Sequence, residues 1–306
     1  MLAGLSVAFD ASCEEMWLAW AHGACLVPAP RSIVKSGLDL GPWLRERRIT
    51  VISTVPTLAS MWPDSMLTDV RLVILGGEAF PPELVTRLQA PGREVWNTYG
   101  PTEATVVACA AMVTGELPVR IGLPLAGWDL AVVDGEGRPV AVGESGELII
   151  GGVGLARYLD PAKDAEKYAP MPTLGWERAY RSGDIVVNDP EGLLFGGRAD
   201  DQVKIGGRRI ELGELDDQLL RLPGVVGAEH CPRQQQIHRR RDDQHQLHLR
   251  GAQHTDGVDG VGRVGHVAAT AYSACARSVF VRDGPRGTRH VVLPVGVCVA
   301  QRSRAL

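Results

Sequence analysis

The sequence lacks several features that would assign it to a class at once. Its 306 residues contain no run of 18 apolar residues, and no basic stretch precedes Asp10, so neither a transmembrane helix nor a secretory signal is predicted. A formal charge of −4 gives no electrostatic reason for binding nucleic acid or an anionic membrane. The few cysteines form no CxxC pair, which fits reduced thiols better than a disulfide framework or a zinc site; they stand at positions 13, 25, 109, 231, 275 and 298. We therefore expect a cytoplasmic protein without a structural metal and with no nucleic-acid or membrane partner.

Lysine and glutamate are absent from residues 230–306, which carry a net charge of +7 against −11 for residues 1–229. Seven of the eight histidines also lie in 230–306, where neither helical nor strand periodicity is easy to find. Two interpretations stay open: a basic arm or histidine-rich metal-binding tract, or a stretch never selected to fold, such as a shifted reading frame. No His/Cys spacing matches a ligand set, which favours the second. We expect an irregular tail.

Before this tail, strand-like and helix-like patterns alternate, as is typical of an α/β layered sheet with flanking helices. The expected strands are 5–9, 24–27, 50–53, 71–75 and 94–97, and the expected helices are 13–21, 40–47 and 81–89. Ser12 and Glu15 can form a capping box for the first helix. From about 106 to 195, turns such as DGEG and NDPEG link short strands, which predicts an antiparallel β region.

The segment NTYGPTEAT at 97–105 carries the first chemical signal. It follows a predicted strand, and open α/β sheets bind ligands at the carboxyl edge of their strands. There Tyr99 could stack on a purine, Thr102 could donate to a phosphate oxygen, and Glu103 could hold Mg²⁺. An ordinary turn is the alternative for the tripeptide YGP alone.

Further motifs accompany this segment in a fixed order: FDAS at 9–12, GGE at 76–78, GELIIGGVGLARYL at 146–159, YRSGD at 180–184 and GRADDQVKIGGRRIELGE at 197–214. Together they resemble the adenylate-forming, AMP-binding superfamily, specifically the amino-acid adenylation domains of nonribosomal peptide synthetases. The resemblance covers about residues 1–229. It implies a large AMP-binding subdomain over 1–196, then a hinge and the start of a small C-terminal subdomain over 197–229.

Such enzymes use ATP and Mg²⁺ to convert a carboxylate into an acyl-adenylate, and they pass the acyl group to a phosphopantetheine thiol on a peptidyl carrier domain. The resemblance implies that the backbone of Gly77 and Glu78 and the ring of Tyr99 enclose adenine. Asn97 would bond the exocyclic amine of adenine. Asp184 would accept the ribose hydroxyls, supported by Arg198.

The resemblance also implies which residues act near the phosphates. Thr102 would contact the α-phosphate, Glu103 would bind Mg²⁺, and Arg209 would reach a phosphate. Asp200 occupies the hinge position, about which the small subdomain swings between two poses.

In the same resemblance, Asp10 matches the carboxylate that holds the α-ammonium of an amino acid, which acyl-CoA synthetases do not need. The remaining pocket walls would be Ala11, Glu14, Ser53, Ile74, Gly76, Thr98, Val106 and Val107. Glu14 would stand among small and apolar groups, where an unpaired carboxylate is costly, so a cationic side chain would satisfy it. The set resembles lysine-type pockets and synthetases that polymerise lysine. The alternative is that Glu14 points to solvent in the first turn of a helix.

Two departures from the family pattern accompany these matches. The Ser/Thr/Gly-rich phosphate loop expected upstream of FDAS is not in the sequence, and Lys204 is the last lysine, so the expected late catalytic lysine has no counterpart. We therefore expect little turnover from this chain. A non-catalytic remnant of a synthetase gene stays an alternative, and a fragment of an acyl-CoA synthetase is a weaker one.

Overall fold

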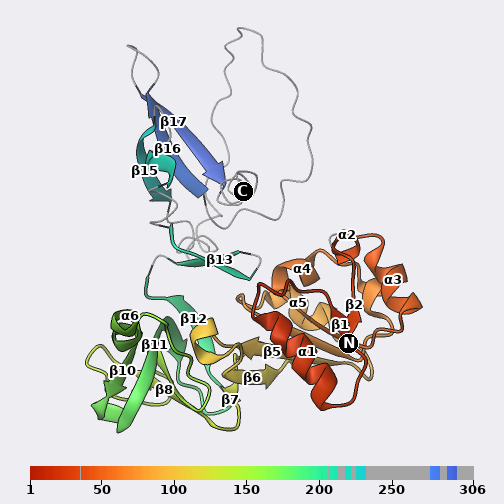
Figure 1. Ribbon diagram of the computed structural model, residues 1–306, viewed down its shortest axis with the longest axis horizontal. Helices are drawn as coiled ribbons and strands as arrows, with labels where there is room; N and C mark the ends of the chain where they lie inside the picture. Colours follow the sequence, from red (N-terminus) through yellow and green to blue (C-terminus); the bar gives the residue numbers. More distant parts are fainter. Residues whose placement is uncertain are drawn as a thin grey trace, which may run out of the picture. The chain divides into compact units, whose positions relative to one another are not determined.

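The computed structural model describes residues 1–34, 36–200, 202–205, 207–212, 218–221, 225–231, 276–282 and 288–294 (Figure 1). The chain divides into two compact units, Met1–Arg209 and Ile210–Leu306. The first unit thus includes residues 197–209, which were expected in the second subdomain. The functional boundaries expected after residues 196 and 229 stay predictions.

The first unit contains a five-stranded sheet with the strand order β3-β4-β5-β6-β7. The first three strands run parallel, and the last two continue the sheet in antiparallel fashion. Their bounds are β3 Val51–Thr54, β4 Leu72–Gly76, β5 Glu94–Tyr99, β6 Cys109–Met112 and β7 Leu123–Pro124. The strands expected at 50–53, 71–75 and 94–97 are confirmed, and with them the α/β layered sheet.

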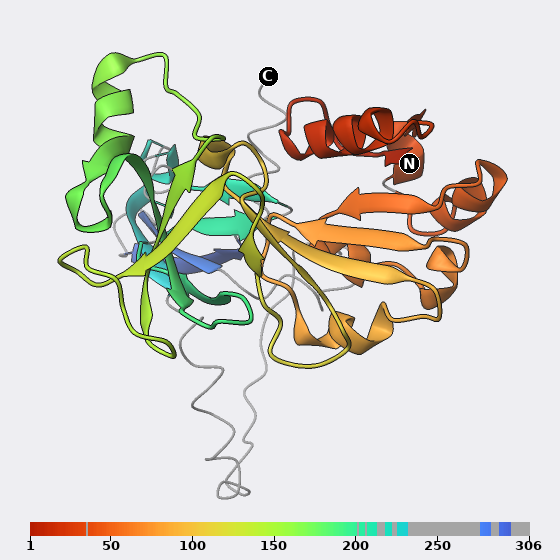
Figure 2. The same cartoon turned by 90° about the horizontal axis from the view of Figure 1, so that it is seen from below.

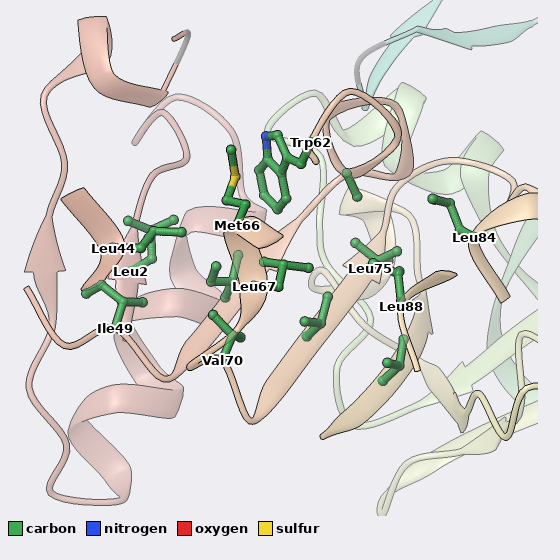
Figure 3. Packing of buried hydrophobic residues seen from close by; sticks show 14 of the residues in the cluster. Leu2, Leu44, Ile49, Trp62, Met66, Leu67, Val70, Leu75, Leu84 and Leu88 are labelled. Carbon is green, nitrogen blue, oxygen red and sulfur yellow. The ribbon is translucent and has the colours of Figure 1, made fainter. Parts of the chain in front are cut away.

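Helices cover both faces of this sheet, and Figure 2 shows α1, in red, on one side of the orange strands and α5 on the other. The bounds are α1 Ala11–Ala21, α2 Arg31–Val34, α3 Leu40–Glu46, α4 Pro56–Ser60, η1 Asp64–Leu67 and α5 Pro82–Arg87. A large apolar core packs the sheet against α3, η1 and α5 (Figure 3). Leu44, Leu67, Leu75 and Leu84 are among its members. Because this burial fixes the strands rigidly, it also fixes the groups at their ends.

The strand expected at residues 5–9 is wrong. These residues form a turn, in which the N–H of Phe9 donates to the carbonyl of Ser6 at 2.8 Å. The observed strand β1 is limited to Leu2–Ala3, and it pairs with β2 (Val27–Pro28), which reduces the strand expected at 24–27 to its last residue.

The side chain of Glu15 is involved at the end of β1 and at the start of α1. Its carboxylate accepts the backbone N–H groups of Gly4, at 2.9 Å, and Leu5, at 3.2 Å, so these donors are not available to a strand. The predicted capping box is also wrong. Helix α1 begins at Ala11, and Ser12 lies inside its first turn, with a buried hydroxyl that has no hydrogen-bond partner among the described residues.

A second sheet of the first unit is antiparallel, as expected for residues 106–195, with the strand order β10-β11-β9-β8 and with β12 paired to β11. The bounds are β8 Trp128–Val133, β9 Ser145–Gly152, β10 Tyr168–Met171, β11 Trp176–Val187 and β12 Leu194–Arg198, with α6 Pro161–Lys167 and the short turns η2 Thr102–Ala104 and η3 Pro172–Leu174. In this sheet Asp184 lies opposite Arg198. The chain then forms a hairpin of β13 (Val203–Ile205) and β14 (Arg208–Ile210).

The second unit contains a three-stranded antiparallel sheet of β15 (Val225–Cys231), β16 (Ala276–Arg282) and β17 (Thr288–Pro294). The last two strands lie in residues 230–306, so the structure differs there from the irregular tail that we expected. Both segments contain valine-rich runs, SVFV and HVVL, which favour strands. Most other residues of 230–306 lie outside the described part of the chain.

Candidate active site

A pocket of about 160 Å³ opens at the carboxyl ends of β3, β4 and β5, the edge at which open α/β sheets bind ligands. We call it the central pocket. Most of the residues predicted from the sequence line it: Asp10, Ala11, Glu14, Ser53, Gly76, Gly77, Thr98, Thr102, Glu103, Val106, Val107, Asp184, Arg198 and Arg209. The fold therefore brings together residues that are up to about two hundred positions apart in the chain.

Glycines allow the walls of the central pocket to approach one another. A Cβ atom at Gly76 would lie 2.4 Å from Oγ1 of Thr98, and one at Gly100 would lie 2.5 Å from the carbonyl oxygen of Val106. Thr105 and Val106 adopt φ angles of 49° and 73°, a region that β-branched residues rarely occupy. The loop after β5 therefore carries backbone strain beside the pocket, as is common at functional sites.

Asp184 lies at the centre of a buried polar cluster and is 2 % exposed. Its Oδ2 accepts a hydrogen bond from the hydroxyl of Tyr99, and its Oδ1 pairs with Arg198 at 2.7 Å. Asp200 holds the same guanidinium through two bonds of 2.6 Å. Burial lowers the pKa of Arg198, but the carboxylates of Asp200 and Asp184 outweigh burial, and the pKa is raised overall. Arg198 therefore stays cationic beside the pocket.

Glu103 is held by three side chains. Its Oε1 accepts a hydrogen bond from the hydroxyl of Tyr158 at 2.8 Å and pairs with Arg209 at 3.2 Å, and its backbone carbonyl accepts from Tyr168 at 2.9 Å. Burial, together with Glu103, raises the pKa of Tyr168 to about 12 and raises the pKa of Tyr158 as well. Both phenols therefore remain hydrogen-bond donors at neutral pH. Tyr158 fixes the orientation of the Glu103 carboxylate at the pocket, and Tyr168 fixes the backbone of Glu103.

Two carboxylates at the start of α1 also line the pocket. Asp10 accepts a hydrogen bond from the hydroxyl of Thr102 at 2.5 Å, and Glu14 accepts one from the hydroxyl of Ser53 at 2.6 Å. Burial raises the pKa of Glu14, and the Ser53 bond opposes part of this rise. The alternative in which Glu14 points to solvent is therefore wrong. A buried carboxylate in this position can bind a cation.

Some predicted residues lie outside the lining of the central pocket: Ile74, Glu78, Asn97, Tyr99 and Asp200. Tyr99 and Asp200 are next to it, because they hold Asp184 and Arg198. Asn97 is turned away and donates from Nδ2 to the carbonyl of Arg120 at 2.8 Å. The reason is the alternation of strand β5, which points Thr98 into the pocket and its neighbour Asn97 to the opposite face.

Several residues of this site were not predicted from the sequence. Lys204, noted only as the last lysine, lines the pocket, and its ammonium lies 5.7 Å from the centroid of the Tyr99 ring. Burial lowers the pKa of this lysine. Ser182 also lines the pocket, and Tyr158 contacts Glu103. Lys204, Ser182 and Tyr158 each lie inside one of the sequence motifs named above, and membership in those motifs could have indicated them.

Two negative findings apply to the described part of the chain. No helix there has the length and hydropathy needed to cross a lipid bilayer. Nor do those residues contain a group of three or more His, Cys, Asp or Glu side chains arranged to hold a metal ion.

Comparisons with known proteins agree with this arrangement. Delta-poly-L-ornithine synthetase of Acinetobacter baumannii is 41% identical over 231 residues, 74% of this chain and 17% of the relative. Bacitracin synthase 3 of Bacillus licheniformis is 39% identical over 247 residues, 80% of this chain and 4% of the relative. The chain thus spans less than a fifth of the length of either protein.

Among solved structures, holo-PA1221, an NRPS protein containing adenylation and PCP domains, has a TM-score of 0.69 and 29% identity. The similarity covers 76% of this chain and 42% of that one. Residues 1–159 match the family described as AMP-binding enzyme, which is more than half of the sequence. The chain therefore belongs to the AMP-binding enzymes, in the group that includes the adenylation domains of nonribosomal peptide synthetases.

Proposed function

We propose that the central pocket serves the ATP-dependent adenylation of an amino acid. In this reaction a carboxylate oxygen of the amino acid bonds to the α-phosphorus of ATP, and the bond from that phosphorus to pyrophosphate breaks. The observation that carries the proposal is the convergence of Asp184, Glu103 and Asp10 on one pocket. Together they offer acceptors for ribose, a carboxylate for a metal and a carboxylate for an ammonium group.

The nucleotide end of the proposal uses the polar cluster around Asp184. An ionised carboxylate has about four acceptor positions, so Asp184 can accept ribose hydroxyls in addition to its bonds with Tyr99 and Arg198. Adenine is assigned to the backbone of Gly77 and Glu78. The contact of Asn97 with adenine stays a prediction that its present orientation does not favour.

The phosphate end uses Thr102, Glu103 and Arg209. Mg²⁺ commonly binds through one or two carboxylates together with substrate phosphates, so the single carboxylate of Glu103 fits a metal that a nucleotide shares. When bound, Mg²⁺ neutralises phosphate charge and so makes pyrophosphate a better leaving group. Tyr158 and Tyr168 keep Glu103 oriented for this contact.

The amino-acid end uses two carboxylates, and we propose a basic substrate such as lysine. Asp10 is assigned to the α-ammonium group. Glu14 is assigned to the cationic side chain, because its carboxylate is largely buried beside a single hydroxyl donor among the described residues. The name of one relative, a poly-L-ornithine synthetase, is consistent with a basic substrate.

We also propose a peptidyl carrier domain as the partner that receives the acyl group on its phosphopantetheine thiol, with Asp200 at the hinge. Support comes from the similar NRPS protein, which contains adenylation and PCP domains. The free thiols of Cys13, Cys25 and Cys109 are consistent with the cytoplasmic location that we propose.

The test measures binding of stable analogues of the reaction intermediate. Non-hydrolysable lysyl-adenylate and norleucyl-adenylate analogues, which differ only at the side-chain amine, are titrated calorimetrically. We expect the lysyl analogue to bind at least about ten-fold more tightly, as for a charge-assisted contact. Glu14→Gln should remove this preference, whereas Glu83→Gln, which changes an exposed first-turn glutamate of α5, should retain it.

Two results would contradict the proposal in different ways. An unchanged preference in Glu14→Gln would show that Glu14 does not select the substrate. If the wild-type chain binds neither of the two analogues and does not bind ATP with Mg²⁺, the central pocket is not an adenylation site.

A further inference from the structure

Glu78 joins two segments that lie far apart in the sequence. Its Oε2 accepts the backbone N–H of Thr57 at 2.9 Å, at the start of α4, and its Oε1 accepts the backbone N–H of Gly207 at 3.0 Å, in the turn of the β13–β14 hairpin. One carboxylate therefore uses both oxygens on backbone donors. Such charge-assisted bonds are stronger than bonds between neutral groups.

Close packing accompanies these bonds. A Cβ atom at Gly207 would lie 2.8 Å from Cγ1 of Val55 and 3.1 Å from the ring of Phe9, and Gly207 has a φ of +74°. A Cβ atom at Gly77 would lie 3.6 Å from Cα of Gly207. The hairpin turn thus packs against the segment that precedes α4 and against the end of β4. Only glycine fits at position 207 in this arrangement.

The β13–β14 hairpin supplies part of the wall of the central pocket. Lys204, Gly207 and Arg209 all line the pocket, and Arg209 pairs with Glu103. Two cationic side chains on this hairpin therefore face the pocket. Their position depends on where the turn of the hairpin is held.

We infer that Glu78 is a positioning residue whose side chain holds the β13–β14 hairpin against the central pocket. This role is separate from the contact with adenine, which is assigned above to the backbone of Glu78. Its carboxylate fixes the Gly207 turn, and through the turn it fixes Lys204 and Arg209. The two N–H groups bond different oxygens of Glu78, and a glutamine replaces one of these oxygens by an NH2 group, which cannot accept, so it can serve only one of them in this geometry. The series Glu, Gln and Ala should therefore weaken the attachment in two steps.

The first measurement is amide hydrogen exchange on the complete 306-residue chain without ligand. In Glu78→Ala we expect the amides of Thr57 and Gly207 to exchange at least about ten-fold faster than in the wild type, with Glu78→Gln intermediate. Exchange of the β4 core amides should stay unchanged. Glu144→Gln is the matched control, because its carboxylate accepts a single backbone N–H, that of Ala141, in an exposed turn.

A second variant breaks the same contact from the other side. Gly207→Ala should displace the turn, since its Cβ would meet Val55, whereas Gly135→Ala has open space and should change nothing. If both positions act through one contact, Glu78→Ala combined with Gly207→Ala should accelerate exchange at Thr57 no more than the stronger single variant. Gly207→Ala also decides the question if Glu78→Ala does not fold.

The third measurement is the dissociation rate of the lysyl-adenylate analogue, which rests on the proposed function. We expect dissociation to be several-fold faster in Glu78→Ala and in Gly207→Ala and unchanged in both controls. Unchanged exchange at Gly207 in Glu78→Ala, or additive effects in the double variant, would overturn the inference. If the wild-type chain does not bind the analogue, the proposed function fails, while the exchange data still decide the role of Glu78.

Discussion

The hydroxyl of Tyr99 donates a hydrogen bond to the carboxylate of Asp184, a residue 85 positions later in the chain. This bond connects the end of β5 in the first sheet with β11 in the second sheet. Burial and the neighbouring Asp184 raise the pKa of Tyr99 well above its ordinary value. The phenol therefore stays protonated, and the bond persists over the whole physiological range of pH.

Tyr99→Phe removes this donor and leaves the remaining ring in place. We expect the free energy of unfolding to fall by about 1.5–3 kcal/mol, as for other hydrogen bonds to charged groups. Urea denaturation of both proteins measures the difference. Tyr158→Phe, which removes a bond to the less buried Glu103, should cost less. Equal stability of Tyr99→Phe and the wild type would mean that the bond contributes nothing.

The raised pKa of Glu14 predicts a pH-dependent affinity for a basic substrate. Burial favours the protonated carboxyl, which cannot pair with a cation, so affinity should rise with pH as Glu14 loses its proton. Titration of the lysyl-adenylate analogue from about pH 5 to about pH 8 should show this rise. The norleucyl analogue, and the lysyl analogue with Glu14→Gln, should lack it. A rise of equal size in Glu14→Gln would assign the dependence to another group.

Glu15 predicts a pH dependence of stability. Burial raises its pKa from 4.5 to about 7, against the opposing effect of its bonds to the N–H groups of Gly4 and Leu5. The folded state therefore binds this proton more tightly than the unfolded state does. The stability that the proton supplies is complete below about pH 4.5 and is lost as the pH rises to about 7.

In Glu15→Gln the side chain stays neutral and keeps an acceptor for one of the two N–H groups. We expect the free energy of unfolding of the wild type to fall more steeply between these pH values than that of the variant. Chemical denaturation at several pH values measures both curves, with Glu83→Gln as the control. Parallel curves for the wild type and Glu15→Gln would contradict the prediction.

The described cysteine thiols should differ in reactivity. Cys13 and Cys25 are exposed, whereas Cys109 is buried, and burial raises its pKa to about 12. Because the thiolate is the reactive form, a thiol reagent should label Cys13 and Cys25 in the folded chain and label Cys109 only after unfolding. Mass spectrometry of the three peptides checks this order. Rapid labelling of Cys109 in the folded chain would show that the β6 region opens readily.

Elements that depend on local pattern could be predicted. The apolar, β-branched runs at 50–53 and 71–75 have few alternatives to a buried strand. Their parallel pairing places the residues at their ends along one edge, where Ser53 and Gly76 line the central pocket. Elements that depend on hydrogen-bond acceptors far away in the sequence could not be predicted. Strand β1 ends at Ala3, before the expected strand at 5–9, where the carboxylate of Glu15 takes the N–H groups of Gly4 and Leu5.

The sequence by itself determined the family, the α/β sheet and most of the residues around the pocket, because the motifs occur in a fixed order and sit at the ends of strands. Only the tertiary structure decided that Asn97 turns away, that Tyr158 holds Glu103 and that Glu78 reaches Gly207. The physical reason is that a hydrogen bond forms between groups that are close in space, whatever their separation in the sequence. Separation along the chain contains no information about these contacts until the fold is formed.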